Sequence, residues 1–195
     1  MGLAYIGMGA NIAGPAGPPE KTLAAAVQEL GRLGSVECQS SLYSTEPVGF
    51  ADQPRFVNAV VGLETVLAAR ELLDALLRIE RTFGRDRART LRNGPRPLDL
   101  DLLLLGNQEI HEPGLDLPHP RMHERMFVMA PLNEISPDTV IVTLGQTVKE
   151  LQQALRTGFP AESDAILPLQ SDTWHARPCR HRGLRAGDFD THGQR

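Results

Sequence analysis

An α+β fold of the ferredoxin-like β-α-β-β-α-β type is predicted by three features of this 195-residue sequence. Strand-like and helix-like periodicities alternate in that order over residues 3–105. Glycine and proline punctuate the ends of these segments. An antiparallel sheet with helices packed on one face suits this order. We expect one domain over residues 1–159, with a helical decoration toward its C-terminal end.

The first half of the chain supplies a strand, a helix and two further strands. Residues 3–8 are predicted as a strand, and residues 7–11, with Gly7 and Gly9, as a tight turn in which glycine permits the backbone geometry. Apolar residues at helical spacing predict a helix over about residues 18–33. Residues 35–43 and 56–63 have the composition of strands.

The second half completes the unit and then changes character. Leucines at helical spacing predict a helix over about residues 68–83, and an arginine-rich loop then leads into a strand that ends at Leu105. Residues 106–155 are expected to add a second layer with a helix near residues 148–155. Residues 160–195 hold few aliphatic side chains and match no usual zinc pattern, so we expect a disordered or loosely attached tail.

Composition excludes several classes of protein. The net charge of −4 argues against broad nucleic-acid binding, which usually requires a basic domain. No apolar stretch approaches the roughly 20 residues that span a bilayer, so no membrane partner is expected. The two cysteines, Cys38 and Cys179, make no disulfide framework and fit a reducing compartment. We therefore expect a monomeric, cytoplasmic protein.

Two carboxylates one residue apart are the strongest chemical signal. Asp99 and Asp101 lie on a predicted strand, so they share one face while Leu98, Leu100 and Leu102 take the other. Carboxylates that close repel each other unless a cation lies between them. Two solvated acids on an open edge strand are the alternative, but the stiff approach through two prolines favours a divalent-metal site.

Arginine is dense immediately before this strand. Arg85, Arg87, Arg92 and Arg96 lie beyond Gly84 in a predicted loop with few acids to pair with. A solvated helix end and loop is one interpretation. A lid that closes on phosphates explains the unpaired charge better, and metal with guanidinium is what phosphoryl transfer needs.

Other candidates are weaker when taken alone. Phe56 and Phe127 could stack a flat heteroaromatic ring with Asn58 at its edge, although burial in the core is the default for phenylalanine. His119 could contact phosphate, although a loop histidine is more often exposed. Glu80 is expected to pair locally, with a polar contact to a nucleotide left open.

Five stretches together resemble the 6-hydroxymethyl-7,8-dihydropterin pyrophosphokinase family over residues 3–155. They are residues 5–11, 43–49, 52–59, 94–101 and 118–127, in the family's order. The Gly-Pro-Arg-Pro-Leu-Asp-Leu-Asp and His-Pro-Arg…Glu-Arg-Met-Phe elements are highly specific. The resemblance implies pyrophosphoryl transfer from ATP to the hydroxymethyl oxygen of the dihydropterin, with release of AMP.

The resemblance also implies roles for particular residues. Asp99 and Asp101 would hold two Mg²⁺ ions, and Arg85 and Arg96 would grip phosphates. Phe56 and Phe127 would sandwich the pterin. The polar edge of the pterin would be read by Thr45, Val48 and Asn58, and the nucleotide would be contacted by Glu80, Arg87, Arg92, His119 and Arg125.

Three rival interpretations remain at this point. A nucleotidyltransferase with the same acid pair would release pyrophosphate instead of AMP. An RNA-recognition module would need aromatic and basic residues on its central strands, which residues 5–8 and 56–63 do not supply. A catalytically idle relative would only bind nucleotide, which the presence of Arg96, Asp99 and Asp101 argues against.

Overall fold

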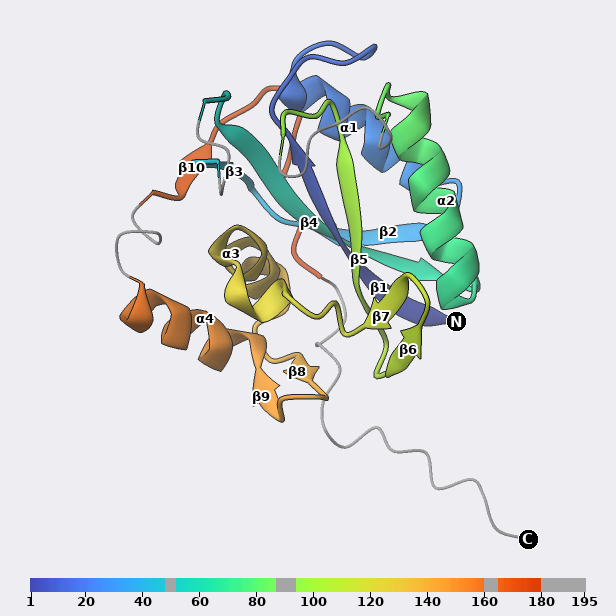
Figure 1. Cartoon of the computed structure of the whole chain (residues 1–195), viewed down its shortest axis with the longest axis vertical. Helices are drawn as coiled ribbons and strands as arrows, with labels where there is room; N and C mark the ends of the chain where they lie inside the picture. The colour runs from blue at the N-terminus through green and yellow to red at the C-terminus, as the bar shows by residue number, and fades with distance from the viewer. Residues whose placement is uncertain (48–51, 87–93, 160–164, 180–195) are drawn as a thin grey trace, which may run out of the picture.

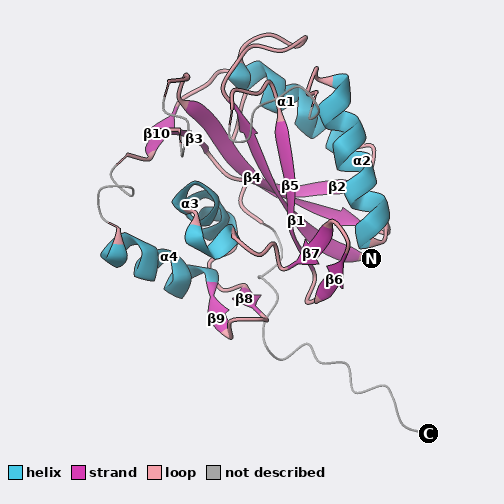
Figure 2. Ribbon diagram, viewed as in Figure 1, coloured by secondary structure: helices cyan, strands magenta, loops and turns pink. Residues whose placement is uncertain are grey.

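An antiparallel sheet forms the centre of the molecule (Figures 1 and 2). The computed structural model describes residues 1–47, 52–86, 94–159 and 165–179. The strands of the sheet are β1 (Gly2–Ala10), β2 (Ser35–Gln39), β3 (Leu42–Thr45), β4 (Phe56–Thr65), β5 (Asp99–Leu105) and β10 (Leu167–Leu169). Their order is β10-β3-β4-β1-β5, with β2 also paired to β4. The predicted combination of helices with an antiparallel sheet is confirmed.

Helices cover both faces of the sheet. On one face α1 (Pro19–Leu30) and α2 (Ala69–Thr82) pack on alternate residues of β1 and β5. On the other face lie α3 (Met126–Ile135) and α4 (Val148–Gly158), over a second apolar cluster that includes Tyr5 and Leu103. The helical layers leave part of this second face uncovered beside α3, where β3, β4 and β5 contribute the polar residues Thr45, Asn58, Asp99 and Asp101.

Side-chain alternation along β5 follows the prediction. Leu98, Leu100 and Leu102 are buried in the cluster beneath α1 and α2. Asp99 and Asp101 take the opposite face, where both line an open cleft. Burial of the leucines thus fixes the register that turns the two carboxylates toward the cleft.

Several small elements escape the prediction. The strand expected over residues 35–43 is divided at Ser40 and Ser41 into β2 and β3, which pair with successive parts of β4. Residues 106–147 add two short hairpins, formed by strands too short to show periodicity, and the first of them packs in the cluster beneath α1 and α2. They are β6 (Ile110–Glu112) with β7 (Leu115–Leu117), and β8 (Val140–Ile141) with β9 (Gln146–Thr147), and a 3₁₀ turn, η1 (Met122–Glu124), precedes α3.

The expectation of a glycine turn over residues 7–11 is wrong. Gly7 and Gly9 lie within β1, opposite Asp101 and Asp99 of β5. Both glycines line the cleft. Neither has the positive φ that a glycine turn requires. Gly9 instead needs the absence of a side chain, because a Cβ built there would lie 2.9 Å from Oδ1 of Asn58.

The expectation of a loosely attached tail is wrong for residues 165–179. Leu167–Leu169 forms β10 at the edge of the sheet, antiparallel to β3. Trp174 is buried, and its indole Nε1 donates to the carbonyl of Ser40 over 2.7 Å. Hydrophobic periodicity did not predict this order, because the segment is attached by one short strand and one buried tryptophan.

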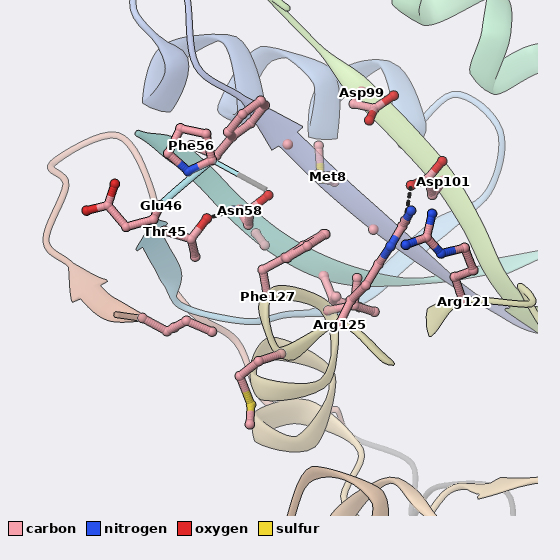
Figure 3. Close-up of a pocket in the computed structure, with 18 of the residues that line it drawn as sticks. Met8, Thr45, Glu46, Phe56, Asn58, Asp99, Asp101, Arg121, Arg125 and Phe127 are labelled. Carbon is pink, nitrogen blue, oxygen red and sulfur yellow. Dashed lines mark hydrogen bonds and ion pairs between the residues drawn. The ribbon is translucent and has the colours of Figure 1, made fainter. Parts of the chain in front are cut away.

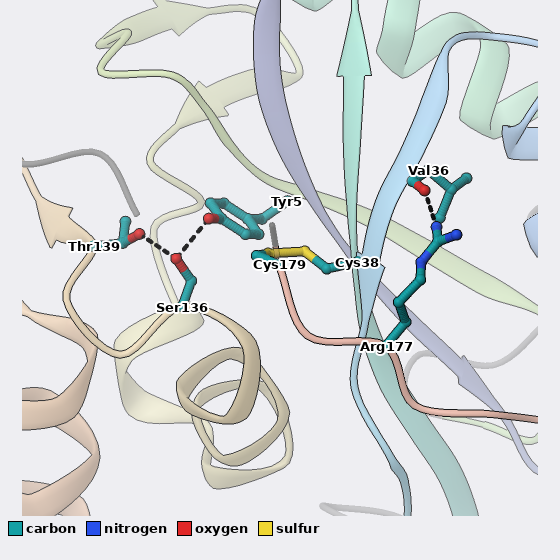
Figure 4. Close-up of a disulfide and its surroundings, with 7 residues drawn as sticks. All are labelled: Tyr5, Val36, Cys38, Ser136, Thr139, Arg177 and Cys179. Atoms are coloured by element: carbon teal, nitrogen blue, oxygen red, sulfur yellow. Dashed lines mark hydrogen bonds between the residues drawn. A yellow bond between two sulfur atoms is a disulfide. The ribbon is translucent and has the colours of Figure 1, made fainter. Parts of the chain in front are cut away.

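The expectation of unpaired cysteines is also wrong. Cys38 of β2 is joined by a disulfide to Cys179, so the segment is attached covalently at its far end (Figure 4). The two cysteines are 141 residues apart in sequence, and their spacing alone does not predict that they pair.

None of the helices in the described ranges combines the length and hydropathy that crossing a bilayer requires.

Candidate active site

A cleft of about 850 Å³ opens beside α3 on the sheet face that carries the two aspartates (Figure 3). It brings together residues from β1, β3, β4, β5 and the start of α3. Ten of the predicted site residues line it: Thr45, Phe56, Asn58, Arg85, Arg96, Asp99, Asp101, His119, Arg125 and Phe127. These residues are up to 82 positions apart in the sequence, so the fold itself assembles the site.

Guanidinium groups surround the acid pair. Arg85 Nη1 lies 2.9 Å from one Asp99 oxygen, and Arg96 Nε lies 3.0 Å from the other. Arg125 Nη1 approaches Asp101 at 3.9 Å, as the dashed line in Figure 3 shows. The predicted lack of acidic partners is therefore wrong for Arg85 and Arg96. Their charge instead compensates Asp99 in a partly buried setting, where ion pairs are screened less than at the surface.

Glu80 of α2 supports the arginine and aspartate cluster from the face of the sheet opposite the cleft. Its side chain is almost fully buried, and one carboxylate oxygen accepts from the backbone N–H of Leu100 over 2.8 Å. The other oxygen lies 3.8 Å from Nε of Arg85. Arg85 also donates to the carbonyl of Leu98. Glu80 is thus absent from the cleft lining, and it ties α2 to β5 and to the position of Arg85, in line with local pairing.

The other end of the cleft is aromatic and hydrogen-bonding. Phe56 begins β4 and Phe127 lies in the first turn of α3, so the two rings come from different layers (Figure 3). Between them Asn58 donates through Nδ2 to the hydroxyl of Thr45 over 2.8 Å, and both side chains are buried. This end can accept a flat ring and offer its edge amide and hydroxyl partners.

An arginine guanidinium also lies over the ring of each phenylalanine. The Arg96 guanidinium lies 4.8 Å from the Phe56 centroid, and that of Arg125 lies 5.6 Å from the Phe127 centroid. Such contacts are attractive and orient the guanidinium plane. The two arginines therefore join the aromatic end of the cleft to its acidic end.

Burial and neighbouring cations keep His119 neutral. Desolvation lowers its pKa, and the positive charge of Arg125 lowers the pKa further. The backbone N–H of Arg121 donates toward Nδ1 of His119, which leaves Nε2 as the protonated nitrogen. A neutral imidazole in this cleft can donate a hydrogen bond to an anionic oxygen without itself carrying charge.

The acid pair also suits a divalent cation in its donor chemistry. Asp99 and Asp101 point from one face of β5, with Cα atoms about 7 Å apart at strand spacing. Within the described ranges no third acid, histidine or cysteine joins them as a ligand set. Mg²⁺ usually keeps several waters and uses one or two carboxylates together with substrate phosphates, which fits two acids in an open cleft.

Three expected site residues lie outside the described residues, and the cleft contains further residues that the sequence did not indicate. Val48, Arg87 and Arg92 lie outside the described residues. Cleft residues that were not predicted as site residues are Gly7, Met8, Gly9, Glu46, Pro47, Ala59, Val60, Arg121, Glu124, Met126, Val128, Ala165 and Ile166. Arg121 and Glu124 fall inside the His-Pro-Arg element and could have been found there. No pattern in the sequence points to Ala165 or Ile166.

Comparison with known proteins identifies the family to which this chain belongs. The model of the 7,8-dihydro-6-hydroxymethylpterin-pyrophosphokinase (HPPK) family matches residues 5–137. The 2-amino-4-hydroxy-6-hydroxymethyldihydropteridine pyrophosphokinase of Pseudomonas aeruginosa is 46% identical over 136 residues, which cover 69% of this chain and 80% of that protein. The enzyme of the same name from Haemophilus influenzae is 43% identical over 150 residues, 76% of this chain and 89% of that protein.

The fold has solved counterparts as well. The crystal structure of Plasmodium falciparum HPPK-DHPS superposes with a TM-score of 0.63 at 13% sequence identity. The superposition covers 88% of this chain and 48% of that longer chain, so the chain spans about half of it. At this identity the likeness concerns the fold. Family model and curated relatives together show that the chain belongs to the 7,8-dihydro-6-hydroxymethylpterin-pyrophosphokinase family.

Proposed function

We propose that this protein transfers the pyrophosphoryl group of ATP to 6-hydroxymethyl-7,8-dihydropterin and releases AMP, a step of folate biosynthesis. The observation that carries the proposal is the cleft itself, in which an arginine-bounded acid pair meets an aromatic, hydrogen-bonding end. One end has the chemistry for a triphosphate and the other for a pterin. Membership in the family agrees with this reaction.

The reaction joins the hydroxymethyl oxygen to the β-phosphorus of ATP. The bond between that phosphorus and the oxygen bridging to the α-phosphate breaks, AMP leaves with this oxygen, and the hydroxyl proton is lost to solvent. Little covalent chemistry is asked of the protein. Catalysis therefore rests on aligning the two substrates and on stabilising the charge of the transferred group.

The arginines and the acid pair are proposed to act on the triphosphate. Asp99 and Asp101 would hold two Mg²⁺ ions, which supply charge neutralisation across the phosphate oxygens when bound. Arg85 and Arg96 would turn from Asp99 toward the phosphates, since a cation between the carboxylates takes over their role there. His119 and Arg125 would contact nucleotide phosphate, and Glu80 would act by fixing Arg85.

The pterin is proposed to bind between Phe56 and Phe127. Asn58 and Thr45 would bond its polar edge, because their mutual hydrogen bond presents one amide and one hydroxyl to the same side. For Val48, Arg87 and Arg92, which lie outside the described residues, we propose the roles that the resemblance implies: Val48 toward the pterin, and Arg87 and Arg92 toward the nucleotide.

Broader properties are proposed on the same basis. The strand order β3-β4-β1-β5 with α1 and α2 on one face supports a ferredoxin-like core, decorated by α3 and α4. We propose a cytoplasmic monomer that acts on small molecules alone. The cytoplasmic setting rests on the substrates of the proposed reaction and no longer on the cysteines, which are paired in the structure. The net charge of −4 disfavours nucleic acid as a partner.

Product analysis tests the proposed reaction. Purified protein is incubated with ATP, Mg²⁺ and 6-hydroxymethyl-7,8-dihydropterin, and the nucleotides and pterins are separated by chromatography. AMP and pterin diphosphate in equal amounts are expected. Release of pyrophosphate instead would indicate attack at the α-phosphorus and a nucleotidyltransferase, and absence of any product would indicate an idle relative.

A further inference from the structure

The C-terminal segment 165–179 forms part of the cleft although it lies beyond the part of the chain that matches the family model. That match ends at residue 137, whereas Ala165 and Ile166 line the cleft. The strand that follows, β10, lies beside β3 at the edge of the sheet (Figure 1). The segment therefore contributes a wall at the β3 side of the site.

Arg55 fastens the start of this segment. Its Nη2 donates to the carbonyl of Ala165 over 2.8 Å, and to the carbonyl of Ser44 over 3.2 Å. Its Nε donates to the Ser44 hydroxyl, and its Nη1 pairs with Glu46. One guanidinium thus joins the end of β3, the start of β4 and the C-terminal segment.

The far end of the segment is anchored independently. Trp174 is buried and bonds to Ser40. Gln39 exchanges two backbone hydrogen bonds with Arg177, and the Cys38–Cys179 disulfide follows (Figure 4). With both ends fixed, the residues that enter the cleft are held against the sheet.

The register of β10 defines where Ile166 lies. Leu167 is opposite Ser44 and Leu169 is opposite Leu42, so the same register continued by one residue sets Ile166 opposite Thr45. Directly opposed residues on antiparallel strands share a face. Thr45 bonds to Asn58 at the aromatic end of the cleft, and Ile166 lines that same cleft. Leu167, one residue on, faces away and is 54% exposed.

We propose that Ile166 is a specificity-determining residue of the pterin end of the cleft, held in place by Arg55 and the anchored C-terminal segment. Its branched apolar side chain closes the site beside Thr45 and limits the width available to the ring. The inference rests on the proposed function, because it assigns Ile166 to the pterin and not to the nucleotide.

Binding measured without turnover tests this assignment. The dissociation constant for 6-hydroxymethyl-7,8-dihydropterin is measured by fluorescence in the presence of Mg²⁺ and a non-hydrolysable ATP analogue, and the analogue's own dissociation constant is measured separately. Ile166→Ala is expected to weaken pterin binding about tenfold, the scale on which loss of apolar contacts acts in a pocket. Ile166→Val, which keeps the branched Cβ and loses one methyl group, should weaken pterin binding less than Ile166→Ala does, and the nucleotide constant should change less than about twofold.

Leu167→Ala is the matched control, since it removes an apolar side chain from the same segment on the face away from the cleft. It should leave both dissociation constants unchanged. Equal pterin affinity in Ile166→Ala and the wild type, or an equal loss of affinity in Leu167→Ala, would overturn the inference. A wild type that binds pterin tightly but forms no AMP would overturn the proposed function and leave the assignment of Ile166 standing.

Discussion

A single methyl group added at Gly9 should damage the pterin site while leaving the fold intact. A Cβ at this position would lie 2.9 Å from Oδ1 of Asn58, and within the described residues no other atom outside its chain neighbours lies within 4 Å of it. The Asn58 amide would have to retreat by about 0.5 Å to reach the ordinary contact distance of 3.4 Å. Its 2.8 Å bond to Thr45 would stretch or break as a result.

Two opposing contributions to stability nearly cancel. Weakening one neutral hydrogen bond costs about 1 kcal/mol. Replacing glycine by alanine at a compatible backbone position returns about 0.4–1 kcal/mol by restricting the unfolded chain. For catalysis there is no such compensation, because a displacement of ~1 Å in a binding group can cost about 100-fold. We expect the half-ångström shift at Asn58 to lower kcat/KM for the pterin about tenfold.

Gly7→Ala is the matched control on the same strand. Its Cβ would lie 3.4–3.6 Å from the Leu103 side chain, which is ordinary contact. Steady-state kinetics with each substrate varied, together with thermal unfolding, separate the two effects. Gly9→Ala should change kcat/KM for the pterin with an unchanged KM for ATP and Tm, and Gly7→Ala should change none of them appreciably. Equal kinetics in the two variants would show that a side chain at position 9 does not disturb the pterin site through Asn58.

Three further changes test the phosphate end of the cleft, His119 and the C-terminal segment. Arg96→Ala should slow turnover far more than it weakens pterin binding, because Arg96 pairs with Asp99 at the phosphate end; an unchanged kcat in steady-state assays would remove it from the mechanism. The pKa of His119 is lowered in the folded protein, so the unfolded chain takes up a proton first as the pH falls below about 6.5. The free energy of unfolding should therefore decrease below that pH. The fall in Tm with pH should be smaller in His119→Gln than in the wild type. Trp174→Ala should cost about 3–5 kcal/mol in denaturant unfolding, whereas a loosely attached tail would show no change.

The local pattern of the sequence was enough to predict the elements with strong periodicity. The strand that carries Asp99 and Asp101 could be predicted because leucines alternate with the acids, and burial of those leucines then orients the acids. Both phenylalanines could be proposed as a pair only through the resemblance to a family. Composition alone favours the core for such residues, and nothing local brings β4 and α3 to one cleft.

Long-range contacts explain what could not be predicted. Residues 165–179 contain little hydrophobic periodicity, and their order comes from partners that lie more than 100 positions earlier in the sequence, namely Ser40, Arg55 and Cys38. The need for glycine at position 9 also depends on a long-range contact, because Asn58 of the neighbouring strand occupies the space that a side chain would need. Ion pairs of Arg85 and Arg96 with Asp99 likewise appear only once the loop and strand are placed in space.

Counting the divalent cations held by Asp99 and Asp101 tests the proposed metal site most directly. Mn²⁺ is titrated into the protein with a non-hydrolysable ATP analogue, and free ions are followed by electron paramagnetic resonance for the wild type and Asp101→Asn. Two bound ions are expected in the wild type and fewer in Asp101→Asn, which should keep its fold by circular dichroism. The same number and affinity of ions in both proteins would exclude Asp101 as a metal ligand.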